Sequence, residues 1–167
     1  MKKSKKTPPV LLRKRHVKQE LKASCVAAAA RMLLDYHGIA GVSEAELRRI
    51  LKNKSHGTHL FNLLFLQDEK RWGLDVEISK GSPNELFATI SIHKIPVIVF
   101  VNTASLPHWD EMAYHVVLAV GYDEEFVIVN DPFFDEKEIQ VLMENFIKAW
   151  GKNDNYMVVI KKKGEVG

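Results

Sequence analysis

The sequence holds a single cysteine, and its surroundings suit nucleophilic chemistry. Cys25 follows Ser24 at the head of an apolar run that extends to His37 and is ended by Gly38. A thiol on the first turn of a helix faces unpaired backbone N–H groups and the positive end of the helix dipole, and both stabilise the thiolate. The position of Cys25 therefore predicts a reactive thiolate, the form of cysteine that attacks carbonyl carbon.

Three other polar residues supply the groups that a cysteine nucleophile needs. His115 opens a predicted strand, and Asp131, sixteen residues later, ends the partner strand. In a hairpin the start of one strand and the end of the next share an edge of the sheet, so the carboxylate can orient an imidazole that serves as base. Gln19, six residues before Cys25, can donate an amide N–H to an oxyanion together with the backbone N–H of Cys25. We predict Cys25, His115, Asp131 and Gln19 as the catalytic residues.

Each of the four residues, taken alone, has a plainer interpretation. An isolated cysteine on an apolar helix is usually a small buried hydrophobe. A lone histidine in a strand is more often structural, and Asp131-Pro132 is a turn signal. The four residues in this order, each on the element that its role requires, favour the catalytic interpretation.

The elements that must position these residues are helices in the first half of the chain and strands in the second. We expect helices over 25–37, after the capping box Ser43–Glu46, from Thr58 to near Gly73, from Ser82 and around 141–150. Strands are expected over 74–78, 95–101, 114–121, 126–129 and 156–160, the last at a sheet edge because three lysines follow it. This pattern predicts an α+β fold in which the nucleophile helix packs against a mostly antiparallel sheet.

Composition indicates one globular domain. The chain has 167 residues, 46% of them hydrophobic and 27% charged, and its one cysteine excludes an internal disulfide framework. It has no apolar run of signal-peptide length and none that could span a bilayer, which predicts a cytoplasmic location. We divide the chain into a basic, disordered arm over 1–15, a single domain over 16–163 and a tail over 164–167.

The positive net charge of the chain comes from its N-terminal end. Residues 1–18 hold eight Lys or Arg and no acid, whereas the remainder holds 16 basic and 21 acidic residues, a balance of −5. A basic arm can contact nucleic acid or an anionic membrane. The body does not interleave basic and aromatic residues, however, so a solvated arm is favoured and no nucleic-acid partner is expected.

Several segments together resemble the C39-like peptidases, the bacteriocin-processing branch of the papain-like cysteine peptidases. The resemblance spans about residues 16–160 and is carried by the stretch from Gln19 through Cys25 to Gly38, by Gly57-Thr58, by Pro96-Val-Ile-Val, by His115-Val-Val-Leu-Ala-Val-Gly-Tyr-Asp123 and by Val129-Asn-Asp-Pro132. It implies a papain-like fold, a peptide or protein substrate and no cofactor. It also implies a nucleophile at Cys25, a base at His115, an orienting carboxylate at Asp131 and an oxyanion donor at Gln19.

Two departures from the family pattern affect the expected substrate. Val26 stands where the family usually has glycine, and its branched side chain would narrow the groove beside the thiol. We expect Val26, Trp109 and Tyr114 to contact the substrate. The chain shows no transporter motif, so we expect a stand-alone peptidase; a non-catalytic peptide- or leader-binding module and a cysteine-dependent acyl transferase remain alternatives.

The remaining histidines are candidate metal ligands. His56 and His59 straddle a predicted loop-to-helix junction, and His108 lies in the loop before His115, with no cysteine to support any of them. Loop polarity is the simpler explanation, so no metal site is predicted.

Overall fold

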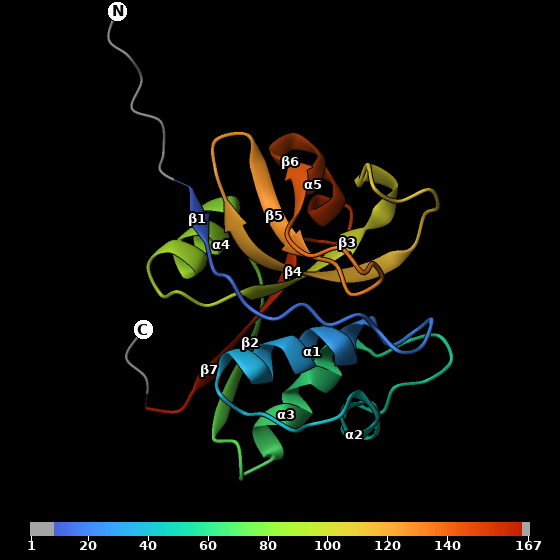
Figure 1. Ribbon diagram of the computed structural model, residues 1–167, viewed down its shortest axis with the longest axis vertical. Helices are drawn as coiled ribbons and strands as arrows, with labels where there is room; N and C mark the ends of the chain where they lie inside the picture. Colours follow the sequence, from blue (N-terminus) through green and yellow to red (C-terminus); the bar gives the residue numbers. More distant parts are fainter. Residues whose placement is uncertain (1–8, 165–167) are drawn as a thin grey trace, which may run out of the picture.

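The computed structural model describes residues 9–164, and there the strands form one antiparallel sheet in the order β2-β7-β3-β4-β5-β6, with β1 paired to β4 (Figure 1). The strands are β1 (Val10–Leu11), β2 (Leu74–Lys80), β3 (Val97–Asn102), β4 (Tyr114–Tyr122), β5 (Phe126–Asn130), β6 (Ile139–Leu142) and β7 (Tyr156–Lys162). The helices are α1 (Cys25–Tyr36), α2 (Glu44–Ile50), α3 (Phe65–Asp68), α4 (Pro83–Ser91) and α5 (Met143–Gly151), with 3-10 segments η1 (Leu60–Leu64) and η2 (Thr103–Ser105). The predicted α+β fold is confirmed.

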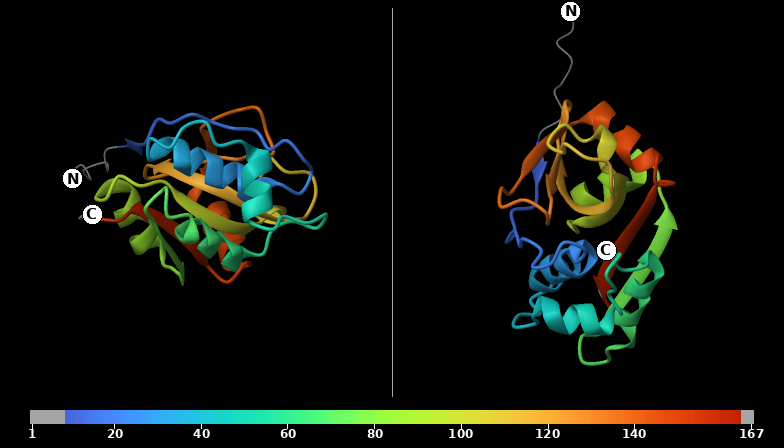
Figure 2. Two further views of the ribbon diagram at one scale, coloured as in Figure 1. Left: turned by 90° about the horizontal axis from the view of Figure 1, so that it is seen from below. Right: turned by 90° about the vertical axis from the view of Figure 1, so that its right-hand side faces the viewer.

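Both faces of the sheet are covered, which explains why its central strands are apolar throughout. Side chains alternate between the faces of a strand. On β3, Ile98 and Phe100 join a core with α1, α2 and α3, whereas Val97 and Val99 join a second core with α4 and α5. Figure 2 shows α1, α2 and α3 gathered at one end of the molecule, on the other side of the sheet from α5.

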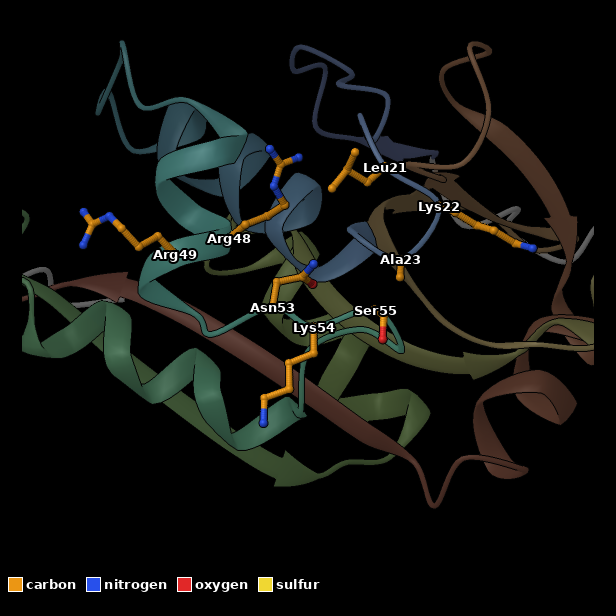
Figure 3. Close-up of a pocket in the computed structure, with 8 residues that line it drawn as sticks. All are labelled: Leu21, Lys22, Ala23, Arg48, Arg49, Asn53, Lys54 and Ser55. Carbon is orange, nitrogen blue, oxygen red and sulfur yellow. The ribbon is translucent and has the colours of Figure 1, made fainter.

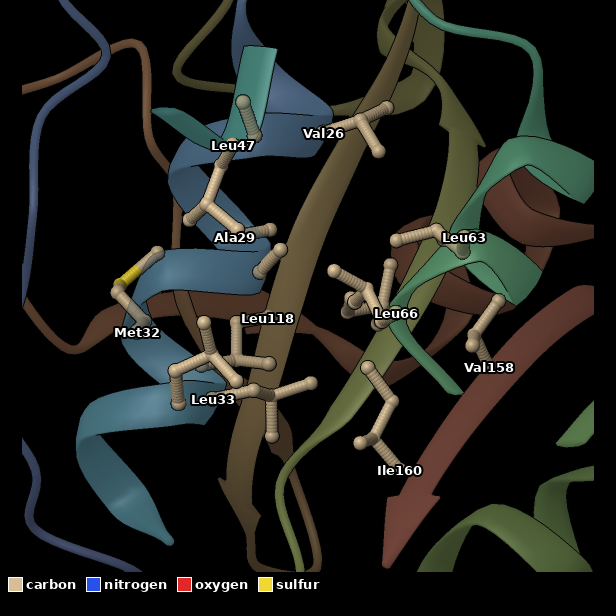
Figure 4. Close-up of a cluster of buried hydrophobic side chains, with 14 of the residues drawn as sticks. Val26, Ala29, Met32, Leu33, Leu47, Leu63, Leu66, Leu118, Val158 and Ile160 are labelled. Atoms are coloured by element: carbon tan, nitrogen blue, oxygen red, sulfur yellow. The ribbon is translucent and has the colours of Figure 1, made fainter. Parts of the chain in front are cut away.

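Helix α1 lies close to the sheet because its buried face is built from small residues. Ala27, Ala28, Ala29 and Ala30 have no exposed surface. Farther along the helix, Leu33 packs with Leu118 of β4 in the same core, which Figure 4 shows between α1, β4 and α3. This packing fixes the first turn of α1, and with it Cys25, against the start of β4.

Two sequence predictions about individual elements were wrong. The third helix is η1 followed by the short α3, and it ends at Asp68 rather than near Gly73; Thr58 does not cap it, because its hydroxyl donates to Asn53. Strand β7 lies between β2 and β3 rather than at an edge. Its lysines stay in the ladder, where Lys161 pairs with Asp75 of β2, so they do not mark the sheet's edge.

Part of the segment expected to be disordered belongs to the sheet. Val10 and Leu11 pair with Tyr122 and Gly121 of β4, and the backbone N–H of Leu12 donates to the carbonyl of Val120 at 2.8 Å. Residues 1–8 of the predicted arm and 165–167 of the predicted tail lie outside the described residues. Among residues 9–164, no helix combines the length and apolar character needed to cross a membrane.

Candidate active site

Cys25 is the first residue of α1, and its thiol is free and partly exposed. Ser24, the residue before it, makes no side-chain cap with the helix, and the first turn carries no acidic residue. The backbone N–H groups at this end of the helix therefore keep their partial positive charge beside the thiol.

The turn before α1 is held by a buried carboxylate that the sequence analysis did not single out. Glu44 of α2 has no exposed surface, and its Oε1 accepts hydrogen bonds from the backbone N–H of Glu20 at 2.9 Å and from the hydroxyl of Ser24 at 3.1 Å. Its other oxygen pairs with Arg48 one turn later. Glu44 thus ties α2 to the segment that carries Gln19 and Cys25.

His115 and Asp131 lie together at one edge of the sheet, as the hairpin argument predicted. Strands β4 and β5 pair with Leu118 opposite Asn130, which places the start of β4 beside the residue that follows β5. His115 Nε2 donates to Asp131 Oδ1 at 2.6 Å, and both side chains are buried. A carboxylate only accepts, so Nε2 carries the proton and Nδ1 is the nitrogen left for another partner.

The environment of this pair favours its charged form. Burial alone would lower the pKa of His115, but hydrogen bonds with Asp131 and with the thiol of Cys25, together with their charges, raise the pKa to about 9. Burial alone would raise the pKa of Asp131, but hydrogen bonds from His108, His115 and Trp109 hold it well below its usual range. An imidazolium between a carboxylate and a thiol can stabilise a thiolate.

Cys25 and His115 open onto the same cavity, whose volume is about 220 Å³. Its lining residues come from the first turn of α1, the segment before η1, β3, β4 and the turn before β7. Val26 and Tyr114, two of the three residues predicted to contact substrate, also line it; Val26 is buried, whereas Tyr114 is exposed. The remaining lining residues are His56, Gly57, Thr58, His59, Leu60, Phe100, Val116 and Asn153.

Trp109, the third residue predicted to contact substrate, is turned toward Asp131 instead of lining this cavity. Its indole Nε1 donates to Asp131 Oδ2 at 2.8 Å, and its ring packs against His115 with ring centroids 4.8 Å apart. His108 Nε2 donates to the same oxygen at 2.8 Å. From the sequence, Trp109 is a predicted substrate contact and His108 is a candidate metal ligand. Their position in the loop just before His115 is the only sequence signal that both bind Asp131.

Gln19 is buried near the site, but its amide faces its own turn. Nε2 donates to the backbone carbonyls of Leu21 and Lys22, both at 2.9 Å, and Oε1 is buried without a hydrogen-bond partner among the described residues. The backbone N–H of Gln19 donates to the carbonyl of Pro132 at 2.6 Å. The structure thus brings Gln19 beside the Asp131 segment, while both of its amide N–H groups are used by the turn.

A larger cavity, of about 510 Å³, is lined by the turn before α1, the end of α2 and residues 53–55. Lys22, Arg48, Arg49 and Lys54 are its basic lining residues, and none of the predicted catalytic residues lines it. Figure 3 shows the side chains of Lys22, Arg49 and Lys54 pointing in different directions rather than toward a common point. The smaller cavity at Cys25 is therefore the candidate active site.

The histidines that are candidate metal ligands are separated by their contacts. His56 and His59 line the Cys25 cavity, whereas His108 is bonded to Asp131 behind it. Within residues 9–164, no three His, Cys, Asp or Glu side chains gather in a way that could hold a metal ion.

The sequence profile of the Peptidase C39 family matches residues 13–165. The chain belongs to the peptidase C39 family. Among curated proteins, none matches this sequence significantly.

Solved structures share the fold of this C39 chain at low sequence identity. A protein from Bacillus anthracis described as a C39-like peptidase is 17% identical, with a TM-score of 0.75 over 95% of this chain and 100% of that one. The peptidase domain of Streptococcus ComA, a bifunctional ABC transporter of a quorum-sensing pathway, is 20% identical. Its TM-score is 0.70, and the match covers 90% of this chain and 100% of that one. A double-glycine-motif protease from an AMS/PCAT transporter, solved in complex with the leader peptide, is 18% identical. Its TM-score is 0.71, and the match covers 95% of this chain and 98% of that one. The chain therefore has the papain-like fold of C39 peptidase domains.

Proposed function

We propose that this C39 chain is a cysteine peptidase that hydrolyses a peptide bond through an acyl-enzyme on Cys25. The observation that carries the proposal is the arrangement of His115, bonded through Nε2 to Asp131 and facing the cavity that Cys25 opens onto. With Nε2 occupied, Nδ1 is the nitrogen that exchanges a proton with the thiol. The roles of nucleophile, base and orienting carboxylate fall to Cys25, His115 and Asp131.

The reaction follows from these contacts. The Cys25 thiolate adds to the carbonyl carbon of the substrate, and the His115 imidazolium then gives its proton to the departing amine as the C–N bond breaks. The resulting thioester is attacked by water, whose proton passes to His115, and the C–S bond breaks to release the acid product and regenerate the thiolate–imidazolium pair. Asp131 holds the imidazole in one tautomer and orientation through both steps.

The oxyanion in this mechanism is assigned to the backbone N–H of Cys25 and to Gln19. The backbone N–H is on the unpaired first turn of α1. The Gln19 amide would have to exchange one of its bonds to the carbonyls of Leu21 and Lys22 for a bond to the substrate oxygen. Substrate binding is therefore proposed to rotate this side chain.

A peptide is the substrate class that the comparisons support. One structural neighbour was solved in complex with a leader peptide, and this chain has the same fold. Gly57 lies among the residues that line the cavity and has no side chain to block an extended main chain there. A cytoplasmic site of action remains part of the proposal.

A second candidate function is a peptide-binding module of the same fold, and the bonded amide of Gln19 favours it. In such a module Cys25 would be alkylated no faster than a free cysteine at the same pH. An acyl transferase would share the thioester and differ only in its acceptor. Reactivity of the thiol separates the first alternative from the peptidase, and product analysis separates the second.

The test uses the protein with a defined peptide mixture analysed by mass spectrometry. Cleavage should be abolished by Cys25→Ala and by His115→Ala, and iodoacetamide should modify Cys25 with a rate that stays high at pH 6. Asp110→Asn, which changes an exposed carboxyl that does not line the cavity, is the control and should retain cleavage. Normal cleavage by Cys25→Ala would refute the mechanism.

A further inference from the structure

The second oxygen of Asp131 is bonded as fully as the first, although only the first faces His115. Oδ1 accepts from His115 Nε2 at 2.6 Å and from the backbone N–H of Phe133 at 3.1 Å. Oδ2 accepts from His108 Nε2 and from Trp109 Nε1, each at 2.8 Å. The carboxylate, which has no exposed surface, thus has four donors and no freedom to rotate.

We propose that His108 and Trp109 are positioning residues that lock the Asp131 carboxylate so that Oδ1 stays aimed at Nε2 of His115. The inference deepens the proposed function, because the two residues act on the reaction only through Asp131 and His115. Neither of them lines the Cys25 cavity, so neither is assigned a contact with substrate. We call the pair the Oδ2 clamp.

The chemistry of the donors suits this task. A carboxylate accepts hydrogen bonds only, so the nitrogens that face Oδ2 must carry protons. Two N–H groups bind Oδ2 and two bind Oδ1, so the carboxylate plane is fixed at both ends. Hydrogen bonds to an ionised group are also stronger than those between neutral groups. Because Asp131 is sealed from water, an unpaired Oδ2 would keep its full desolvation cost, and the carboxylate would turn toward any remaining donor.

The surroundings make the clamp rigid and dry. Trp109 packs on His115 on one side and on Phe133 on the other, the latter with ring centroids 4.6 Å apart. His108 meets the ring of Phe134, which itself contacts Trp109. This aromatic cluster therefore covers the His115–Asp131 bond while its two polar edges hold Oδ2.

Three substitutions separate donor loss from loss of shape. His108→Leu removes one donor, whereas His108→Gln retains an N–H of similar reach. Trp109→Phe removes the other donor and keeps an aromatic ring against His115. Trp150→Phe is the matched control, because it removes an indole N–H that donates to the carbonyl of Tyr156 at 3.1 Å rather than to Asp131.

Two measurements read the site without a known substrate. The first is the rate of Cys25 alkylation by iodoacetamide at pH 7. The second is the NMR signal of the proton on His115 Nε2, assigned with His115→Gln, which is sharp only if the bond to Asp131 is fixed and shielded from water. If His108 and Trp109 served only the stability of the fold, a variant with an unchanged melting temperature would keep both the alkylation rate and the His115 signal of the wild type.

We expect His108→Leu and Trp109→Phe each to slow alkylation about tenfold, in line with the loss of a hydrogen bond to a buried charge. Both should broaden the His115 proton signal, His108→Gln should restore most of both properties, and Trp150→Phe should change neither. An unchanged signal and rate in both His108→Leu and Trp109→Phe would overturn the clamp. If wild-type Cys25 reacts like free cysteine, the proposed peptidase function fails, and the His115 signal still decides the clamp.

Discussion

Replacing Asp131 with asparagine should change how the stability of the fold depends on pH. Asparagine has the shape of aspartate but one acceptor and one donor group. Whichever way the amide turns, an N–H group faces either His115 or the pair His108 and Trp109. The substitution therefore removes the negative charge and also sets two donors against each other in a buried place.

The magnitude follows from the pKa of His115. Contacts in the folded state raise it from 6.5 to about 9, and 2.5 pH units correspond to about 3 kcal/mol. Because the folded-state pKa exceeds the unfolded value, this stabilisation is fully present below about pH 6.5 and is lost as the pH rises through 9. In Asp131→Asn, burial dominates and lowers the pKa of His115. The variant therefore lacks this stabilisation at low pH, and its stability does not fall as the pH rises through 9. Asp131 itself, with its pKa lowered, contributes a constant amount over this range.

The assay is urea unfolding followed by circular dichroism at pH 6, 7.5 and 9.5. Both proteins carry Cys25→Ser so that no thiolate titrates in the window; because Cys25 provides part of the rise in the pKa of His115, about 3 kcal/mol is an upper value. The loss of unfolding free energy caused by Asp131→Asn should be largest at pH 6 and shrink toward pH 9.5. Asp110→Asn, which changes an exposed carboxyl in the neighbouring loop, is the control. A difference that stays constant across the three pH values would refute the reasoning.

Two further predictions concern the oxyanion donor and the N-terminal strand. Gln19→Ala should lower kcat about 100-fold with little effect on KM if the amide rotates toward the oxyanion; an unchanged kcat would leave the backbone N–H of Cys25 as the donor. Gly121→Ala would place a methyl group 2.3 Å from the carbonyl oxygen of Val10, which belongs to backbone and cannot yield without β1 moving. It should cost about 1–3 kcal/mol of stability and speed hydrogen exchange at the N–H of Leu12, and equal exchange rates would contradict the pairing.

The parts of the site that the sequence could predict are those encoded by local pattern. Cys25 could be placed at a helix start because Ser24 and the alanine run mark the boundary. His115 and Asp131 could be paired because a short connection joins β4 to β5 and brings the start of one strand to the end of the next, although the register itself shifts between Ala119 and Gly121. Their 2.6 Å bond confirms that argument.

The parts that could not be predicted depend on contacts between distant segments. Strand β7 pairs with β2 and β3, which come more than 50 residues earlier, and nothing in its own lysine-flanked sequence encodes those neighbours. The first part of the third helix takes 3-10 geometry, which apolar spacing does not distinguish, and the helix ends early because the backbone of Glu69 leaves the helical region. From the sequence, His108 is interpreted as loop polarity and Trp109 as a substrate contact, because their acceptor, Asp131, follows them by more than 20 residues.

The same long-range contacts explain how residues 90 positions apart, Cys25 and His115, can share a site. The segment before α1 is bonded directly to the segment after β5: the backbone N–H of Gln19 donates to the carbonyl of Pro132, and His16 Nε2 donates to the carbonyl of Phe134, both at 2.6 Å. One segment leads into Cys25 and the other begins with Asp131. A displacement of the nucleophile helix relative to the sheet would therefore have to break two buried or partly buried bonds to backbone carbonyls as well as the packing of α1 on β4. These backbone bonds fix the position of the first turn of α1 relative to the sheet. The side-chain rotamers of Cys25 and His115 then determine how closely the thiol and the imidazole approach.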